Sequence, residues 1–121
     1  MPDPPPGYHT VTPRMVVADV AGAVDFLRTV FGAIGDVHPD RPAEMHIGDS
    51  LIMVTSVGER GLFPSFLYVY VEDADRVYQR AIDAGATSIE PPRDTPYGDR
   101  RAMVSDPHGN LFQIARRPLA Q

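Results

Sequence analysis

A chain of 121 residues fits one domain that can bury a hydrophobic core of its own. It contains no cysteine, which excludes disulfides, thiol catalysis and thiolate metal sites, so a metal ion would need His, Asp or Glu ligands. The formal net charge of -5 argues against a nucleic-acid surface, because phosphate binding needs clustered basic residues.

The first seven residues, 1–7, are rich in proline and are expected to form an extended or disordered lead-in. This stretch lacks the basic start and the apolar run of a signal peptide. The apolar runs elsewhere in the chain are too short to cross a membrane. We therefore expect a soluble, cytoplasmic protein with one domain over residues 8–121 and with no nucleic-acid or membrane partner.

The first half of the chain has the pattern of a strand, a helix and three further strands. The helix is the clearest element, because Asp19 can cap its start, apolar residues recur every three or four positions up to Phe31, and Gly32 ends it. Residues 58–64 are typical of a linker. The strands are expected over residues 9–17, 34–37, 43–47 and 50–56.

The second half repeats this order. A strand over residues 66–71 leads to a helix that Asp73 can cap and that ends at Gly85. A long loop over 91–98 and a tight turn over 106–110 separate the strands that follow. Those strands are expected over residues 87–90, 101–105 and 111–116. The repeated order indicates an internal duplication and an α+β fold of two βαβββ modules.

The strand over residues 66–71 has one aromatic and one aliphatic face. Successive side chains of a strand point to opposite faces, so Phe66, Tyr68 and Tyr70 share one face and the intervening Leu and Val residues share the other. The aliphatic face is expected to pack beneath the following helix. The aromatic face suits either a second packed layer or the wall of a pocket. The duplication favours the pocket, because each helix covers one face of its sheet and leaves the other to form a concave surface.

Several short motifs occur in an order that is specific as a set. They are residues 17–19 with the helix end at 31–33, then 47–50, 83–86, 96–100 and 106–110. With this set the chain resembles the vicinal oxygen chelate superfamily, the group of glyoxalase I, extradiol dioxygenases, and fosfomycin and bleomycin resistance proteins. The resemblance implies two modules, residues 8–57 and 63–117, whose curled mixed sheets face a cavity. It also implies a homodimer in which both chains complete two equivalent sites.

Metal-dependent members of this superfamily place their ligands on the first and last strand of each module. Carried over by the motifs, these positions fall at Thr12, Met53, Phe66 and Gln113. A hydroxyl, a thioether, a phenyl ring and an amide are poor ligands for a divalent cation, which prefers imidazole or carboxylate here. The resemblance therefore implies a member without a metal cofactor, like the bleomycin resistance proteins.

Other polar residues leave alternatives open. Arg14 shares the face of Thr12 and could meet a ligand carboxylate, stack on a ring or pair with an acidic residue. Arg100 and Arg101 should point to opposite faces, so at most one reaches the cavity. Tyr97 and its proline-rich loop could form a flap over the pocket or a plain surface crossover.

A metal pair of Glu44 and His46 is a weaker alternative. The two residues lie two apart on one expected strand and could share a face, but a third ligand is missing and exposed surface positions explain them equally. His38 and His108 fall in expected loops.

The sequence favours a metal-free protein that sequesters a planar or aromatic, antibiotic-like compound. A glyoxalase-type or dioxygenase-type enzyme with unusual or no metal ligands is the alternative, and a domain whose aromatic face is filled by its own side chains is a third. The ligand-binding residues expected are Thr12, Arg14, Met53, Phe66, Tyr68, Tyr70, Tyr97, Arg101 and Gln113.

Overall fold

The computed structural model of the chain describes residues 3–58 and 61–118, which form an α+β domain of two helices and seven strands. The elements follow the order β1 (Arg14–Val17), α1 (Val20–Phe31), β2 (Ala43–Ile47), β3 (Ser50–Ser56), β4 (Phe66–Tyr70), α2 (Ala74–Asp83), β5 (Thr87–Asp94), β6 (Arg100–Ser105) and β7 (Leu111–Arg116).

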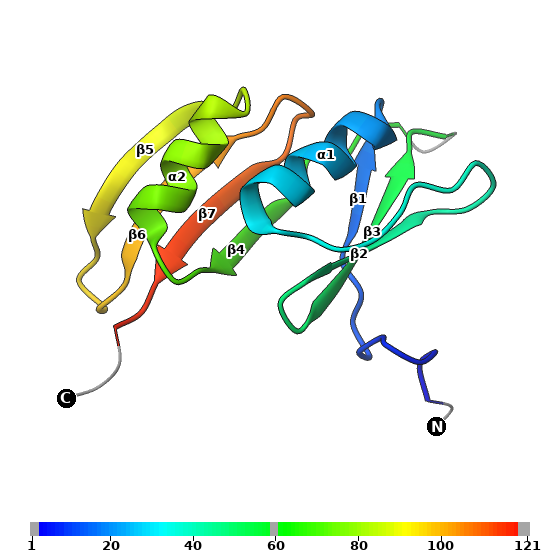
Figure 1. Cartoon of the computed structure of the whole chain (residues 1–121), viewed down its shortest axis with the longest axis horizontal. Helices are drawn as coiled ribbons and strands as arrows, with labels where there is room; N and C mark the ends of the chain where they lie inside the picture. The colour runs from blue at the N-terminus through cyan, green and yellow to red at the C-terminus, as the bar shows by residue number, and fades with distance from the viewer. Residues whose placement is uncertain (1–2, 59–60, 119–121) are drawn as a thin grey trace.

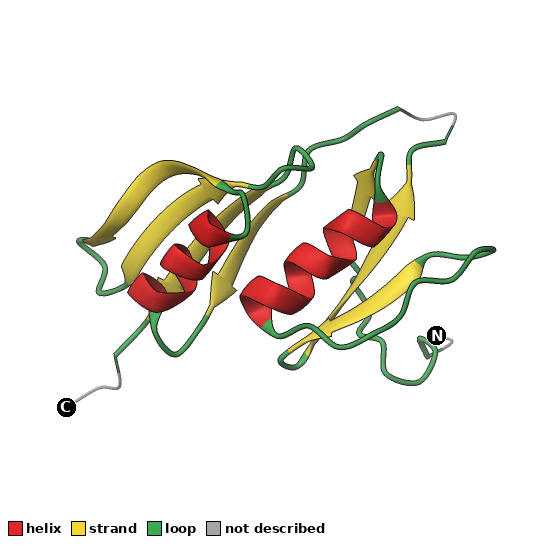
Figure 2. Ribbon diagram, turned by 45° about the horizontal axis from the view of Figure 1, so that its top comes forward, coloured by secondary structure: helices red, strands yellow, loops and turns green. Residues whose placement is uncertain are grey.

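Each half of the chain builds one mixed sheet and one helix. The first sheet has the order β1-β3-β2 and the second the order β4-β7-β6-β5. In each, the first strand is an edge strand that pairs in parallel with the last strand of its module, and the other pairs are antiparallel. The sheets lie side by side along the long axis, with α1 and α2 on the same side of them (Figures 1 and 2). The predicted duplicated α+β fold is confirmed.

One hydrophobic core joins the two modules. Phe112 of β7 is fully buried and packs against two rings of α1, with centroid distances of 5.9 Å to Phe26 and 5.2 Å to Phe31. Arg80 of α2 adds a polar link, since its guanidinium donates to the carbonyl oxygen of Val30 at 2.7 and 3.1 Å. The modules therefore stabilise each other and are not two independent domains.

Both predicted helix starts and the end of α1 are confirmed, whereas α2 ends at Asp83, two residues before the expected Gly85. The Asp19 carboxylate accepts a hydrogen bond from Gly22 N at 3.0 Å, and Asp73 accepts one from Arg76 N at 3.1 Å. These bonds satisfy backbone donors that have no partner inside the helix. Gly32 closes α1 with φ of 68°, a left-handed conformation that glycine adopts without steric cost.

Two strands of the first module differ from the prediction. The strand expected over 9–17 begins only at Arg14, after Pro13, which has no N–H and joins the ladder only through its carbonyl oxygen, accepting from Met53 N at 3.0 Å. The strand expected over 34–37 is reduced to one bridge between Ile34 and His46. The chain cannot continue as a ladder there, because prolines at 39 and 42 remove two donors.

In the second module, β5 is longer than expected and runs through Pro91 and Pro92. It can hold two prolines because it is an edge strand, with no neighbour on one side and with register shifts against β6 on the other. The loop expected over 91–98 thus shortens to the turn that joins β5 to β6.

Among residues 3–58 and 61–118, no helix is long and apolar enough to cross a membrane. Residues 3–13 form neither helix nor strand, although a turn bonds Tyr8 N to Pro5 O at 3.0 Å and the Tyr8 hydroxyl donates to Glu44. The extended lead-in over residues 1–7 and the module boundaries remain predictions. Residues 1–2, 59–60 and 119–121 lie outside the described residues.

The shared core predicts a large stability effect at one position. Phe112→Ala should lower the free energy of unfolding by about 3–5 kcal/mol in urea denaturation, because it leaves a cavity between the modules. Phe66→Ala is the matched control. Its ring is 61% exposed, so the change should stay within about 0.5 kcal/mol. Equal losses in both variants would contradict a core shared at Phe112.

Candidate functional site

The face of the second sheet that points away from α2 carries most of the expected ligand-binding residues, and we call it the open face. Along β4, Leu67 and Val69 pack against the core, whereas Phe66, Tyr68 and Tyr70 are 61%, 38% and 57% exposed. The predicted division of this strand into an aliphatic core face and an aromatic outer face is confirmed. The exposed rings also argue against a face that the protein fills with its own side chains.

Strand register extends the open face across the sheet. Tyr68 pairs with Gln113, which pairs with Met103, and all three side chains therefore point the same way. In the next row, Tyr70 pairs with Ala115, which pairs with Arg101.

The two neighbouring arginines of β6 separate as predicted. Arg100 points to the helix side, where it binds Asp75 of α2 at 3.0 and 3.2 Å. Arg101 points to the open face, where its Nη1 donates to the Tyr97 hydroxyl at 2.9 Å. Tyr97 belongs to the turn between β5 and β6, so this turn brings a phenol hydroxyl to Arg101, while the Tyr97 side chain itself stays 53% exposed.

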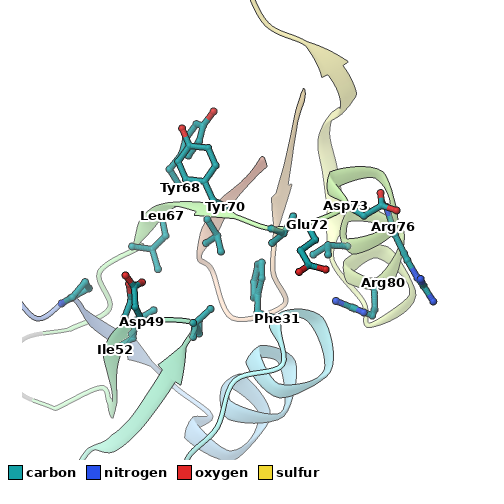
Figure 3. A pocket seen from close by; sticks show the side chains of 17 residues that line it. Phe31, Asp49, Ile52, Leu67, Tyr68, Tyr70, Glu72, Asp73, Arg76 and Arg80 are labelled. Carbon is teal, nitrogen blue, oxygen red and sulfur yellow. The ribbon is translucent and has the colours of Figure 1, made fainter. Parts of the chain in front are cut away.

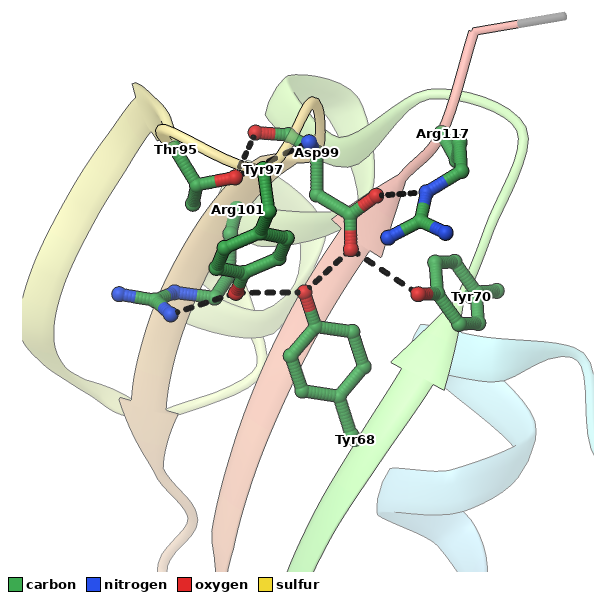
Figure 4. Close-up of polar contacts among 7 residues, drawn as sticks. All are labelled: Tyr68, Tyr70, Thr95, Tyr97, Asp99, Arg101 and Arg117. Atoms are coloured by element: carbon green, nitrogen blue, oxygen red, sulfur yellow. Dashed lines mark hydrogen bonds and ion pairs between the residues drawn. The ribbon is translucent and has the colours of Figure 1, made fainter.

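The polar network at the turn end of the open face is built on a carboxylate that the sequence analysis did not identify. Asp99 is 1% exposed. Its Oδ2 accepts hydrogen bonds from the hydroxyls of Tyr68 at 2.6 Å and Tyr70 at 3.0 Å, and its Oδ1 accepts one from Arg117 Nε at 2.7 Å (Figure 4). A buried carboxylate needs such partners, because burial without them would cost several kcal/mol. Asp99 therefore fixes the positions of both tyrosine hydroxyls.

The β5–β6 turn holds Asp99 in place. Thr95 N donates to Asp99 O at 2.8 Å, and the Thr95 hydroxyl both donates to that oxygen at 2.9 Å and accepts from Asp99 N at 3.0 Å. Gly98 has φ of 100°, which the tight turn requires. The only sequence signal was an Asp at the end of a turn, opposite a strand with two tyrosines on one face.

The hydroxyl protons of Tyr68, Tyr70 and Tyr97 are all directed toward Asp99. Tyr68 and Tyr70 each have one proton, and each donates it to the carboxylate. The Tyr97 hydroxyl lies 3.2 Å from that of Tyr68 and must therefore be the donor of that pair. Arg101 donates to Tyr97 in turn. The result is a directed chain from Arg101 through two phenols to the carboxylate.

These contacts shift the acidities of the groups involved. Burial alone would raise the pKa of Asp99, but hydrogen bonds from Tyr68, Arg117 and Tyr70 outweigh it and hold this pKa below its ordinary value of 3.8. Burial and the bond to Asp99 raise the pKa of Tyr68 far above its ordinary value. The hydrogen bond to Asp99 also raises the pKa of Tyr70. Both phenols therefore stay protonated at neutral pH.

The remaining expected ligand-binding residues lie on the first sheet. Arg14 and Met53 are register partners, and Arg14 Nη2 lies 3.6 Å from the Met53 sulfur. Thr12 precedes β1 and is not part of the strand. Within the described ranges, no hydrogen bond or ion pair joins these three residues to the open face.

The register supports the equivalence of the two modules at these positions. Arg14 pairs with Met53 in the first sheet as Tyr68 pairs with Gln113 in the second. Thr12 and Phe66 each lie two residues before those pairs.

The residues at the superfamily's ligand positions do not fit a divalent metal. Thr12, Met53, Phe66 and Gln113 offer no carboxylate or imidazole. In the part of the chain that the structure describes, no three His, Asp or Glu residues gather as a metal site would need. Of the alternative pair, Glu44 is bound by the Tyr8 hydroxyl and His46 is exposed.

A hollow lies between the modules, on the side of β4 opposite the open face. This inter-module cleft has a volume of about 770 Å³. Its walls include Phe31, Ile52 and Leu67, and charged side chains such as Glu72 and Arg76 line it nearer α2 (Figure 3). Although Tyr68 and Tyr70 border the cleft, Figure 3 shows their rings pointing away from it. The cleft and the open face are therefore separate surfaces.

Comparison with known proteins places this geometry in a family context. Residues 8–114 match the family model described as the Glyoxalase/Bleomycin resistance protein/Dioxygenase superfamily. The crystal structure of TioX from Micromonospora sp. ML1 superposes with a TM-score of 0.78 at 28% identity, covering 91% of this chain and 99% of that one.

Two relatives are similar in sequence. An uncharacterized protein of Mycobacterium tuberculosis is 31% identical over 124 residues, covering 88% of this chain and 73% of that protein. The anthracycline biosynthesis protein DnrV of Streptomyces peucetius is 30% identical over 118 residues, covering 81% of this chain and 42% of DnrV.

The lowered pKa of Asp99 predicts acid sensitivity. A group whose pKa is lower in the folded state stabilises the fold above its ordinary pKa of 3.8, and this contribution is lost as the pH falls through the lower, folded value. Asp99→Asn should therefore flatten the decline in the free energy of unfolding below about pH 4–5. Urea denaturation at several pH values measures this decline.

Asp75→Asn is the control for this experiment. The hydrogen bond from Arg100 lowers the pKa of Asp75 as well, but that ion pair is on the helix side and 56% of the Asp75 side chain is exposed, so water screens it. The control should flatten the acid decline less. An Asp99→Asn variant with the wild-type pH profile would show that this carboxylate is not what titrates.

Proposed function

The chain belongs to the Glyoxalase/Bleomycin resistance protein/Dioxygenase superfamily, and from that premise we propose that it binds and sequesters a planar, aromatic compound without using a metal ion. The observation that carries this proposal is the open face, where Phe66, Tyr68 and Tyr70 remain exposed although each could stack on a flat ligand. Each such stacking contact contributes about 0.5–1.5 kcal/mol beyond the area it buries.

We propose that this surface binds an antibiotic-like compound. Sequestering that compound in the cytoplasm would make the cell resistant to the drug. The similarity to DnrV supports it, since that protein is named for anthracycline biosynthesis and anthracyclines are planar ring systems. The open face also suits such a ligand better than the inter-module cleft does, because it offers three rings and the cleft only the ring of Phe31.

We further propose that a homodimer completes the site. The resemblance to the superfamily implies such a dimer. In a dimer, Thr12, Arg14 and Met53 of one protomer would face the open face of the other, which brings together the residues that a single chain keeps apart.

Ligand binding can be tested at a ring whose loss does not harm the fold. Phe66→Ala should weaken binding of an anthracycline about 2- to 10-fold, because one stacking contact is lost. Arg76→Ala is the matched control, since it changes the inter-module cleft and leaves the open face intact. Fluorescence titration gives the dissociation constants.

The outcomes separate the alternatives. Loss of affinity in Arg76→Ala, with unchanged affinity in Phe66→Ala, would indicate that the ligand binds in the cleft.

A thermal-shift plate of divalent metals and planar aromatic compounds should show a raised melting temperature with the aromatic compounds only. Stabilisation by Mn, Fe, Ni or Zn that a chelator reverses would contradict the proposal and favour the glyoxalase-type or dioxygenase-type enzyme.

The shared site predicts complementation between two defective variants. One double variant, Arg14→Ala and Met53→Ala, impairs the first-sheet half of each site. A second double variant, Phe66→Ala and Tyr70→Ala, impairs the second-sheet half. A mixed dimer should then hold one intact site and one doubly impaired site. Co-refolding equal amounts of the two variants should restore about a quarter of the tight sites, because about half of the dimers are mixed and each of these has one intact site of two; titration at known protein concentration measures this fraction.

Light scattering provides the accompanying measurement. A mass of twice 13.3 kDa is expected. A monomer that binds the ligand with wild-type affinity, or a mixture that recovers no tight sites, would contradict the shared site.

A further inference from the structure

We propose that the ligand of the open face carries an anionic group, a carboxylate or a similar oxyanion, and that Arg101 receives it. This inference rests on the proposed function and names the chemical class of the ligand. Some hydrogen-bond donors of the open face have no good partner within the protein, and these donors are available to a ligand.

The hydroxyl protons of the network are already used. Both oxygens of Asp99 accept hydrogen bonds from Tyr68, Tyr70 and Arg117. The hydroxyl proton of Tyr97 goes to Tyr68. The Asp99 carboxylate and the three phenols thus leave a ligand no free proton donor among them.

Arg101 retains donors without good partners. Its side chain is 14% exposed. Of its five N–H bonds, one binds the Tyr97 hydroxyl at 2.9 Å, and one reaches Glu90 only at 3.5 Å. Its Nε is buried and has no hydrogen-bond partner. Nε and Nη2 form the edge of a guanidinium that binds a carboxylate through two parallel bonds, and this edge is the poorly satisfied one.

The charge balance of the open face agrees with this assignment. Glu90 is closer to Arg93, at 3.1 Å, than to Arg101. Three arginines, Arg93, Arg101 and Arg117, therefore share two carboxylates, Glu90 and Asp99. The network carries one excess positive charge on a chain whose net charge is -5, which attracts an anion to this face.

A ligand oxyanion that replaces the long contact with Glu90 would give the free Arg101 donors strong partners. Glu90 keeps Arg93 as its own partner in that case. The rings of Phe66 and Tyr68 on the same face would meanwhile hold the flat part of the ligand. The geometry thus assigns the anionic end to β6 and the aromatic end to β4.

The test compares two probes of the same shape, anthracene-2-carboxylate and anthracene-2-carboxamide. The wild-type protein should bind the acid at least about tenfold more tightly, because hydrogen bonds to a charged group are stronger than neutral ones. Arg101→Gln should lower the affinity for the acid to that for the amide, and Arg101→Lys should recover only part of it, since lysine lacks the planar fork.

Arg100→Gln is the matched control, because the neighbouring arginine points to the helix side and binds Asp75. It should retain the preference for the acid. Equal binding of acid and amide by the wild type would overturn the anionic ligand while leaving aromatic binding intact, whereas binding of neither probe would count against the proposed function itself. Loss of the preference in Arg117→Gln instead of Arg101→Gln would overturn the assignment to Arg101.

Discussion

The buried carboxylate of Asp99 is the interaction on which the open face depends. A carboxylate that is 1% exposed needs hydrogen-bond partners, and side chains from outside its own turn supply them. Tyr68 and Tyr70 reach it from β4, and Arg117 reaches it from the end of β7. The same bonds hold the two phenol rings upright on the sheet, so one constraint of burial also shapes the proposed binding surface.

A second constraint keeps that surface free. The core between the modules is centred on Phe112 and lies on the helix side of the sheets, together with Phe26 and Phe31. Because the apolar residues of α1 and α2 are used there, Phe66 and Tyr70 stay 61% and 57% exposed in the described part of a single chain, although Arg117 lies over the Tyr70 ring at 6.0 Å. The chain can expose these rings without losing stability, since it draws that stability from the opposite face.

The open face supports the proposal that this member of the superfamily binds its ligand without the metal ligands that other members use. Where metal-dependent members need imidazole or carboxylate, this chain has Phe66 and Gln113 on the second sheet, and the neighbouring positions hold Tyr68 and Tyr70. We propose that aromatic side chains serve here as stacking surfaces in place of metal ligands. The shared fold with TioX and the sequence similarity to DnrV do not by themselves define the ligand.

The sequence by itself determined the duplicated α+β fold, both helix caps and the two faces of β4, because these follow from local periodicity and from the chemistry of single residues such as Asp19 and Gly32. It also separated Arg100 from Arg101, since neighbours in a strand point to opposite faces. It predicted β1 to be longer than it is and did not predict that β5 continues through Pro91 and Pro92. Proline removes a hydrogen-bond donor from a strand, but an edge strand tolerates that loss. Only the tertiary structure decided that Asp99 is buried among the phenols, because a turn residue gains partners 29 and 31 positions away only when β4, β6 and β7 are assembled.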